Sequence, residues 1–256
     1  MDEIGVERSD GVVTVTLNRP GKKNAVHTGM WSELTRIFNE VKGNDADRVL
    51  VITGAGGAFC SGADLSGGDG LQQTGLIRMR MIGEAALALN HLTKPTIAKV
   101  GGVAAGAGCN LALGCDLIVA SEEARFSEIF ARRGLSLDFG GSWVLPRLVG
   151  IHKAKELAFF AEVIDAHEAE RLGIVNRVVP RAELDKFVDD WAARLAAGPP
   201  LALSMTKTML NNAFSVSMEQ ALEDEARCQT VNFASEDTVE AMTAFAQKRD
   251  PVFKGR

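Results

Sequence analysis

Two glycine-rich segments, each following a short apolar run, carry backbone groups that could do chemistry. They read GAGGAFCSGADL over residues 54–65 and GGVAAGAGCN over residues 101–110. A backbone N–H at the start of a helix has no intrahelical acceptor and lies at the positive end of the helix dipole, so it can bind a developing negative charge. One such loop alone is better explained by glycine allowing close packing. Two converging loops would form an oxyanion hole for an enolate or a tetrahedral intermediate.

Dinucleotide binding by these loops and metal binding by the cysteines or histidines have weaker support. The dinucleotide pattern Gly-x-Gly-x-x-Gly fails in both loops because Phe59 and Leu111 occupy the third glycine position. The four cysteines include no Cys-x-x-Cys pair, and the four histidines lack metal-ligand spacing. We therefore expect reduced thiols and no metal site.

Asp138 is an acidic residue in the segment LSLDFGG, outside the glycine loops. Taken alone, the segment favours a turn, because Asp before Phe-Gly-Gly is good turn chemistry. Leu135, Leu137 and Phe139 surround the carboxyl with apolar groups. Desolvation would raise its pKa toward the range useful to a proton shuttle.

The elements that must position these residues follow an α/β order over the first two thirds of the chain. Residues 3–18 predict a hairpin divided by Asp10-Gly11, with Val13, Val15 and Leu17 on one face. Residues 48–54 and 96–102 predict buried strands, and residues 76–92 a helix between them. Helical spacing over residues 30–42 predicts a buried face made of Met30, Trp31, Leu34, Ile37, Phe38 and Val41.

After about Pro180 the pattern is helical only, with a break at Gly198-Pro199-Pro200. Ser217 and Asp237 each begin a capping-box spacing. We predict a core over residues 1–197 and a helical oligomerisation segment over residues 198–256. Residues 66–75, SGGDGLQQTG, predict a flexible segment.

The overall charge argues against nucleic acid and anionic membranes as partners. The formal net charge is −5 and the pI is about 5.5, with no block of like charges. The N-terminus has no signal-peptide pattern, and no run approaches the roughly 18 apolar residues of a spanning helix. We expect a cytoplasmic protein that binds a small molecule.

Five ordered motifs resemble the enoyl-CoA hydratase/isomerase (crotonase) superfamily, and the likeness runs from the first hairpin to the last residue. The motifs are AFCSGADL, GVAAGAGCNLALGCDLIVASEEARF, GLSLDFGGSWVLPRLVG, EAERLGIVNRVV and FAQKRDPVFKGR. The resemblance implies a crotonase (ClpP-like) spiral of strand-strand-helix units with a C-terminal helical trimerisation segment. It also implies a coenzyme A thioester substrate, no further cofactor, and homotrimers or homohexamers.

The resemblance also implies roles for particular residues. The oxyanion hole would be the N–H groups of Ala63 and Ala107, the latter standing where the family usually has glycine; alanine keeps the N–H. Asp116 would be a loop-fixing residue. Lys248, Arg249 and Lys254 would reach coenzyme A phosphates from a neighbouring subunit, or form a solvated basic tail. The substrate contacts implied are Ala25, Cys60, Gly62, Asp64, Leu65, Gly106, Phe130 and Lys248.

The chain departs from the hydratase pattern at both catalytic glutamates, whose positions hold Asn110 and Phe130. Water addition needs a carboxylate to activate water and an acid to protonate the α-carbon, and neither residue can serve. Asn110 is expected to orient substrate or to cap its helix. Glu128 lies two residues from the second glutamate position and is interpreted as a solvated or structural carboxylate.

Asp138 matches an aspartate of superfamily branches that shift a double bond or open a ring epoxide. The ring-epoxide isomerase of phenylacetyl-CoA breakdown has the closer local pattern, with Phe at the second glutamate position and GGxWxLPR after it. We therefore predict an acyl-CoA isomerase. The alternatives are an enoyl-CoA hydratase and a non-catalytic CoA- or RNA-binding member, although the acidic pI speaks against RNA.

Overall fold

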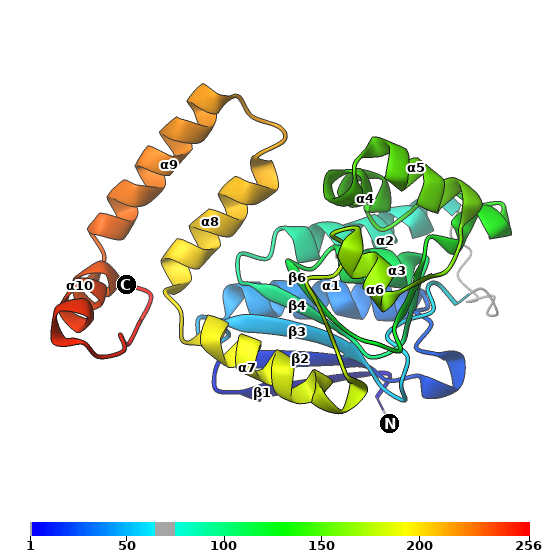
Figure 1. Cartoon of the computed structure of the whole chain (residues 1–256), viewed down its shortest axis with the longest axis horizontal. Coiled ribbons are helices and arrows are strands. Elements are labelled where there is room, and N and C mark those ends of the chain that lie inside the picture. The colour runs from blue at the N-terminus through cyan, green and yellow to red at the C-terminus, as the bar shows by residue number, and fades with distance from the viewer. Residues whose placement is uncertain (1, 65–74) are drawn as a thin grey trace.

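The computed structural model describes residues 2–64 and 75–256 and has a mixed α/β architecture, with two sheets and a helical C-terminal part (Figure 1). The larger sheet has the spatial order β1 (Ile4–Ser9), β2 (Val12–Leu17), β3 (Val49–Gly54), β4 (Thr96–Val100), β6 (Leu117–Ser121) and β9 (Arg177–Val179). The smaller sheet has the order β5 (Val103–Ala105), β7 (Arg125–Ser127) and β8 (Ile164–Asp165). Strands β2, β3, β4, β6 and β9 run parallel, so the loops that follow β3 and β4 leave the same edge of the sheet.

The N-terminal hairpin is confirmed. β1 and β2 pair antiparallel with Ser9 opposite Val12, and Asp10 and Gly11 between them have φ of 51° and 80°. Two adjacent left-handed residues suit the twist of a tight hairpin, and Asp and Gly tolerate this conformation best. The predicted inner face is fully buried: Val13, Val15 and Leu17.

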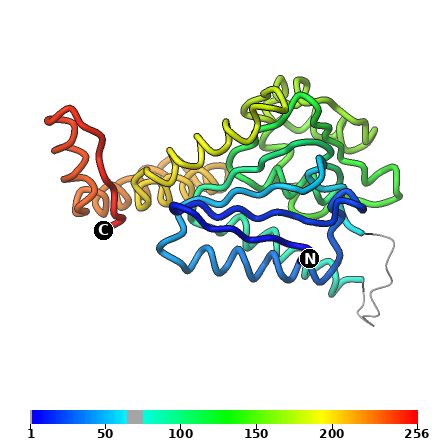
Figure 2. The backbone as a smooth tube through the Cα atoms, turned by 90° about the horizontal axis from the view of Figure 1, so that it is seen from below, coloured from blue at the N-terminus to red at the C-terminus, as the bar shows by residue number. Residues whose placement is uncertain are grey.

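Helices cover both faces of the larger sheet, which lies between α1 and α7 (Leu184–Ala196) (Figure 2). The side chains of β3 alternate: Leu50 and Ile52 belong to the main core, whereas Val49 and Val51 pack with α7. The main-core face is covered by α1 (Thr28–Gly43) and α2 (Gly75–Asn90), which pack on each other. The predicted buried face of α1 is confirmed in full: Met30, Trp31, Leu34, Ile37, Phe38 and Val41.

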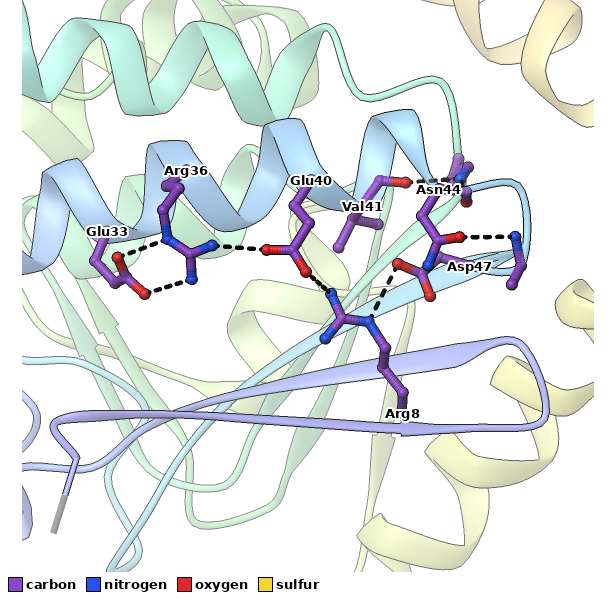
Figure 3. A network of polar contacts seen from close by, with 9 residues as sticks. Arg8, Glu33, Arg36, Glu40, Val41, Asn44 and Asp47 are labelled. Atoms are coloured by element: carbon purple, nitrogen blue, oxygen red, sulfur yellow. Dashed lines mark hydrogen bonds and ion pairs between the residues drawn. The ribbon is translucent and has the colours of Figure 1, made fainter.

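A chain of ion pairs joins the hairpin to α1 (Figure 3). Arg8 on β1 donates to Glu40 at 2.8 Å and to Asp47 at 3.4 Å. Arg36 bridges Glu33 and Glu40 along the outer face of α1, with its contact to Glu40 at 2.7 Å. Exposed pairs of this kind contribute about 0–1 kcal/mol each, so the buried face of α1 provides most of its stability.

Short elements fill the space between the sheets and the long helices. They are η1 (Pro20–Lys22), α3 (Ala107–Leu113), η2 (Ile129–Arg133), α4 (Gly141–Val149), α5 (Ile151–Phe160), α6 (Ala166–Arg171) and η3 (Arg181–Glu183). The predicted flexible segment lies, up to Thr74, outside the described residues. None of the described helices is long and apolar enough to cross a membrane.

The C-terminal segment consists of α8 (Pro200–Asn212), α9 (Met218–Phe233) and α10 (Glu236–Gln247), which lie to one side of the sheet (Figure 1). Ser217 caps α9 by accepting from Gln220 N–H, as predicted. The predicted cap of α10 is wrong: Ser235 caps it, and the Asp237 carboxylate instead accepts the N–H groups of Lys254 and Gly255. Asp237 cannot be the N-cap because α10 begins one residue before it, at Glu236.

Asp116 joins the core to the C-terminal segment. Its Oδ2 accepts from Thr96 N–H at 2.7 Å and from Lys207 Nζ of α8 at 2.7 Å. Lys207 also donates to the Lys94 carbonyl at 2.9 Å. These contacts fit the loop-fixing role expected for Asp116.

Candidate active site

The two glycine loops lie against each other at the carboxyl edge of the sheet. Phe59 N–H and Cys60 N–H both donate to the Val103 carbonyl at 3.0 Å, and Ala105 N–H donates back to the Cys60 carbonyl at 2.9 Å. The loop after β3 therefore runs alongside β5. This pairing brings the backbone groups of the two loops together, as the sequence predicts.

Ala63 and Ala107 present N–H groups at this junction. Neither N–H has an acceptor among the residues that the structure describes. A Cβ added to Gly62 would lie 3.6 Å from the Ala107 nitrogen, which shows how closely the loops approach. Gly106 has φ 54° and ψ −130°, a conformation open to glycine, and it turns the chain into α3. Ala107 is the first residue of that helix and its backbone accommodates a Cβ.

Cys60 lies in the contact between the loops and not on the pocket wall. A Cβ at Gly108 would lie 2.7 Å from Cys60 Sγ and would collide with its carbonyl oxygen. Cys60 is fully buried, and burial raises the pKa of its thiol to about 12. The expectation that Cys60 contacts substrate is therefore corrected: this side chain fills the loop contact that Gly108 makes possible.

A cavity of about 470 Å³ opens in front of the two N–H groups. Its wall is made of Lys22, Ala25, Ser61, Gly62, Ala63, Asp64, Ala105, Gly106, Ala107, Ile129, Phe130, Arg133, Leu135 and Asp138. Most of the expected substrate contacts thus share one pocket. Leu65 lies outside the described residues. Asp64 is ion-paired with Arg19 at 2.9 Å, so one of its oxygens is committed at the edge of the wall.

Two basic wall residues were missed by the sequence reasoning, Lys22 and Arg133. Each lies three residues along the sequence from a predicted substrate contact, Ala25 or Phe130, and this short separation could have indicated that they line the pocket. A pocket for a polyanionic thioester carrier gains from cations of this kind at its wall.

Asp138 is half-buried on the pocket wall, and burial raises the pKa of its carboxyl to about 6. Its Oδ1 is buried and has no hydrogen-bond partner among the described residues. The turn is closed by its backbone instead, because its carbonyl accepts from Gly141 N–H at 2.9 Å. Phe139 and Gly140, both at positive φ, complete that turn. The carboxyl is therefore not needed to close the turn, and Asp138 contributes to the pocket wall.

Asn110 lies behind the pocket wall, 1% exposed. Its Nδ2 donates to the Asp138 carbonyl at 3.0 Å and to Glu128 Oε2 at 3.3 Å. The expectation that Asn110 orients substrate is corrected, because both hydrogens of its amide nitrogen are used inside the protein and its side chain does not line the cavity.

Glu128 is 3% exposed, so of the two alternatives expected for it the solvated carboxylate is wrong and the structural carboxylate remains. It lies between β7 and η2, and it faces a small cleft that Cys109, Leu145 and Leu157 also line. Burial raises the pKa of its carboxyl to about 7.

The basic C-terminal residues do not reach this pocket within one chain. Lys248 ends α10 in a left-handed conformation, and α10 lies on the side of the molecule away from α4 and α5 (Figure 1). Arg249 makes a two-pronged pair with Glu240 at 2.5 and 2.9 Å. Substrate contact by Lys248 is therefore corrected for the single chain, because the C-terminal segment extends away from the core. Among residues 2–64 and 75–256, no group of His, Cys, Asp and Glu is arranged to hold a metal ion.

Comparisons with known proteins agree on one family. The sequence model of the enoyl-CoA hydratase/isomerase family matches residues 7–256. A "Probable enoyl-CoA hydratase" of Rhodobacter capsulatus is 40% identical over 256 residues, covering 99% of this chain and 98% of the relative. The 1,2-epoxyphenylacetyl-CoA isomerase of Escherichia coli K12 is 35% identical over 251 residues, 96% of each protein. The crystal structure of an enoyl-CoA hydratase from Bacillus anthracis superposes with a TM-score of 0.94 at 30% identity, covering all of both chains.

Proposed function

This chain belongs to the enoyl-CoA hydratase/isomerase family, and on that premise we propose that it is an acyl-CoA isomerase whose base is Asp138. The observation that carries the proposal is a half-buried carboxyl on the pocket wall, with no ion-pair partner among the described residues and a pKa raised to about 6. The position where a hydratase would carry its second glutamate is filled by Phe130, which lies on the same wall.

In the proposed reaction the thioester oxygen lies between the N–H groups of Ala63 and Ala107. The Asp138 carboxylate removes a proton from the γ-carbon of a 2-enoyl thioester. The C–H electron pair forms the new β,γ double bond, and the former double-bond electrons pass into the enolate. The two N–H groups stabilise the enolate oxygen. Asp138 then returns the proton to the α-carbon, so one residue serves both steps and the product is an isomer. A ring-epoxide thioester would be opened through a similar enolate.

Most of the similar relatives are named hydratases, and hydration is the competing reaction. It requires a group that activates water, and Phe130 on the wall and Asn110 behind it have no acidic proton or basic oxygen for this role.

Products from a panel of thioesters test the proposal. The panel contains 2-enoyl, 3-enoyl, dienoyl and ring-epoxide CoA esters, analysed by mass and ultraviolet absorbance. Isomers of unchanged mass are expected from at least one ester. Crotonyl-CoA that gains one water as the main product would overturn the isomerase assignment.

We also propose that the chain assembles as trimers or dimers of trimers. Large apolar side chains on the C-terminal segment are strongly exposed in the single chain: Leu210, Phe214, Met218, Phe233 and Phe245. An apolar surface of this extent marks an interface. In an assembly a neighbouring copy could bring Lys248 to the pocket.

Light scattering at micromolar concentration should return the mass of three or six chains. Phe233→Glu combined with Phe245→Glu should shift the distribution to smaller species because it places charge in the interface. The exposed change Lys186→Glu, on α7, also makes the chain two charges more negative; it serves as the control for added charge and should not alter the mass. A wild-type monomer across this concentration range would contradict the assembly.

A further inference from the structure

Three residues beside the pocket are linked by hydrogen bonds: Glu128, Asn110 and Asp138. Of these, only Asp138 takes part in the proposed reaction. Asp138 offers Asn110 a backbone carbonyl, which can only accept, so the atom of the Asn110 amide that faces it is the nitrogen. The second hydrogen of the same nitrogen is directed to Glu128 Oε2. One amide therefore ties the buried carboxyl of Glu128 to the backbone that carries the pocket carboxyl.

This group has more acceptors than donors. Asn110 Oδ1, Glu128 Oε1 and Asp138 Oδ1 are all buried without a hydrogen-bond partner among the described residues. Buried unpaired acceptors are costly, and two carboxylates without a cation repel in a medium of low dielectric. If one of the two carboxyl groups, Glu128 or Asp138, keeps its proton, only one negative charge remains and the protonated carboxyl provides a hydrogen-bond donor.

We propose that Glu128 is a positioning residue for Asp138: through Asn110 it fixes the backbone of the base, and it retains the proton of the carboxyl pair so that Asp138 is the ionised member near neutral pH. This inference rests on the proposed function only for its effect on turnover. Burial assigns the proton, because Glu128 is enclosed whereas Asp138 lines the pocket.

The neighbours of Glu128 act on its pKa in both directions, and burial has the largest effect. The Cys109 thiol of α3 and the Asn110 amide hydrogen-bond to the Glu128 carboxyl and lower its pKa, whereas burial raises the pKa to about 7. The thiol itself stays protonated, because burial and then the Glu128 charge raise its pKa. Asp138 acts on Glu128 as a like charge. Glu162, after α5, lines the same small cleft but is exposed, and Asp165 of β8 is exposed and caps α6. Arg133 of η2 also lines the pocket, and no ion pair joins it to either carboxyl among the described residues.

The pKa values give the expected pH dependence. Asp138 loses its proton near pH 6 and Glu128 near pH 7. Turnover should rise as Asp138 ionises and fall as Glu128 ionises, because a second buried negative charge opposes the enolate and its anionic carrier. Glu128→Gln keeps the acceptor for Asn110 but cannot ionise. In this variant, turnover should still rise near pH 6 but should no longer fall above pH 7.

The first experiment does not depend on the reaction. Isotope-edited infrared spectra of the ligand-free full chain report the carboxyl protonation of labelled Glu and Asp, and Glu128→Gln and Asp138→Asn assign the signals. We expect a Glu128 signal that disappears on raising the pH through about 7 in the wild type. If no labelled glutamic acid of the wild type keeps its proton above the ordinary range of glutamic acid, the proposal is overturned, and this result needs no folded variant.

The second experiment measures exchange of substrate α- and γ-protons with deuterated water from pH 5 to 9. Glu162→Gln, the matched control from the same cleft, should keep the wild-type profile because its carboxyl is exposed. If exchange in Glu128→Gln falls above pH 7 as it does in the wild type, Glu128 does not control the ionisation of the site and has only a structural role. Absence of exchange in wild type at every pH would refute the proposed function, while the infrared titration would still decide the role of Glu128.

Discussion

Asp138→Asn is expected to slow exchange of substrate α- and γ-protons by about 10²- to 10⁴-fold, the contribution of a positioned acid-base group. Asparagine keeps the shape of the side chain and leaves the backbone carbonyl free to bind Asn110 and Gly141 as before. It cannot accept a proton at neutral pH. The loss should appear in kcat, with substrate affinity little changed, because the thioester is held by backbone groups elsewhere in the pocket. Wild-type exchange in this variant would falsify the assigned base and move attention to Glu128.

The stability of the same variant separates a lost base from a damaged fold. The pKa of Asp138 is about 6 in the folded protein, above its ordinary value of 3.8. The unfolded chain therefore releases this proton at lower pH, and wild-type stability falls as the pH rises from about 4 through 6. Asparagine does not ionise and has no such loss. Denaturant unfolding above pH 6 should find Asp138→Asn at least as stable as wild type, and a large destabilisation would mean that the slow exchange comes from misfolding.

Gly62→Ala is expected to reduce kcat by about 10²- to 10³-fold, the effect of losing one oxyanion donor. The added methyl would lie 2.9 Å from the Ala105 carbonyl oxygen and 3.6 Å from the Ala107 nitrogen. The loop after β3 must therefore move away from the end of β5, and the Ala63 N–H moves with it relative to the Ala107 N–H. Because these donors act mainly on the enolate, kcat should fall more than KM rises.

Gly57→Ala is the matched control for this change. Gly57 lies in the same loop at φ +86°, close to the φ of +102° at Gly62, but a Cβ there meets open space. Both variants carry the backbone strain of a side chain at positive φ, about 1–2 kcal/mol. Gly57→Ala should lose stability and keep its turnover. Equal losses of turnover in the two variants would show that strain, and not the position of the N–H groups, governs the reaction.

Local rules determine much of this protein. Asp10-Gly11 specifies the hairpin because few other residues tolerate two successive left-handed conformations. The buried face of α1 follows from apolar spacing, because one turn of helix places residues three and four apart on the same side. The resemblance of the ordered motifs implies that the two glycine-rich loops and Asp138 share one site, and the described pocket contains Ala63, Ala107 and Asp138 together.

The tertiary structure alone decided which of the polar residues are buried and what each one faces. Glu128 lies in a connection with no periodic pattern, and it is enclosed because α3 and the segments around α4 and α5 come together over it. Asn110 hydrogen-bonds to Glu128 inside the protein and does not line the pocket. Cys60 packs against Gly108, in the contact between the two loops. Lys248 stands apart from the pocket because the C-terminal helices extend from the core (Figure 1). Burial of a loop side chain depends on elements distant in sequence, whereas spacing reports only which residues share a face of one element.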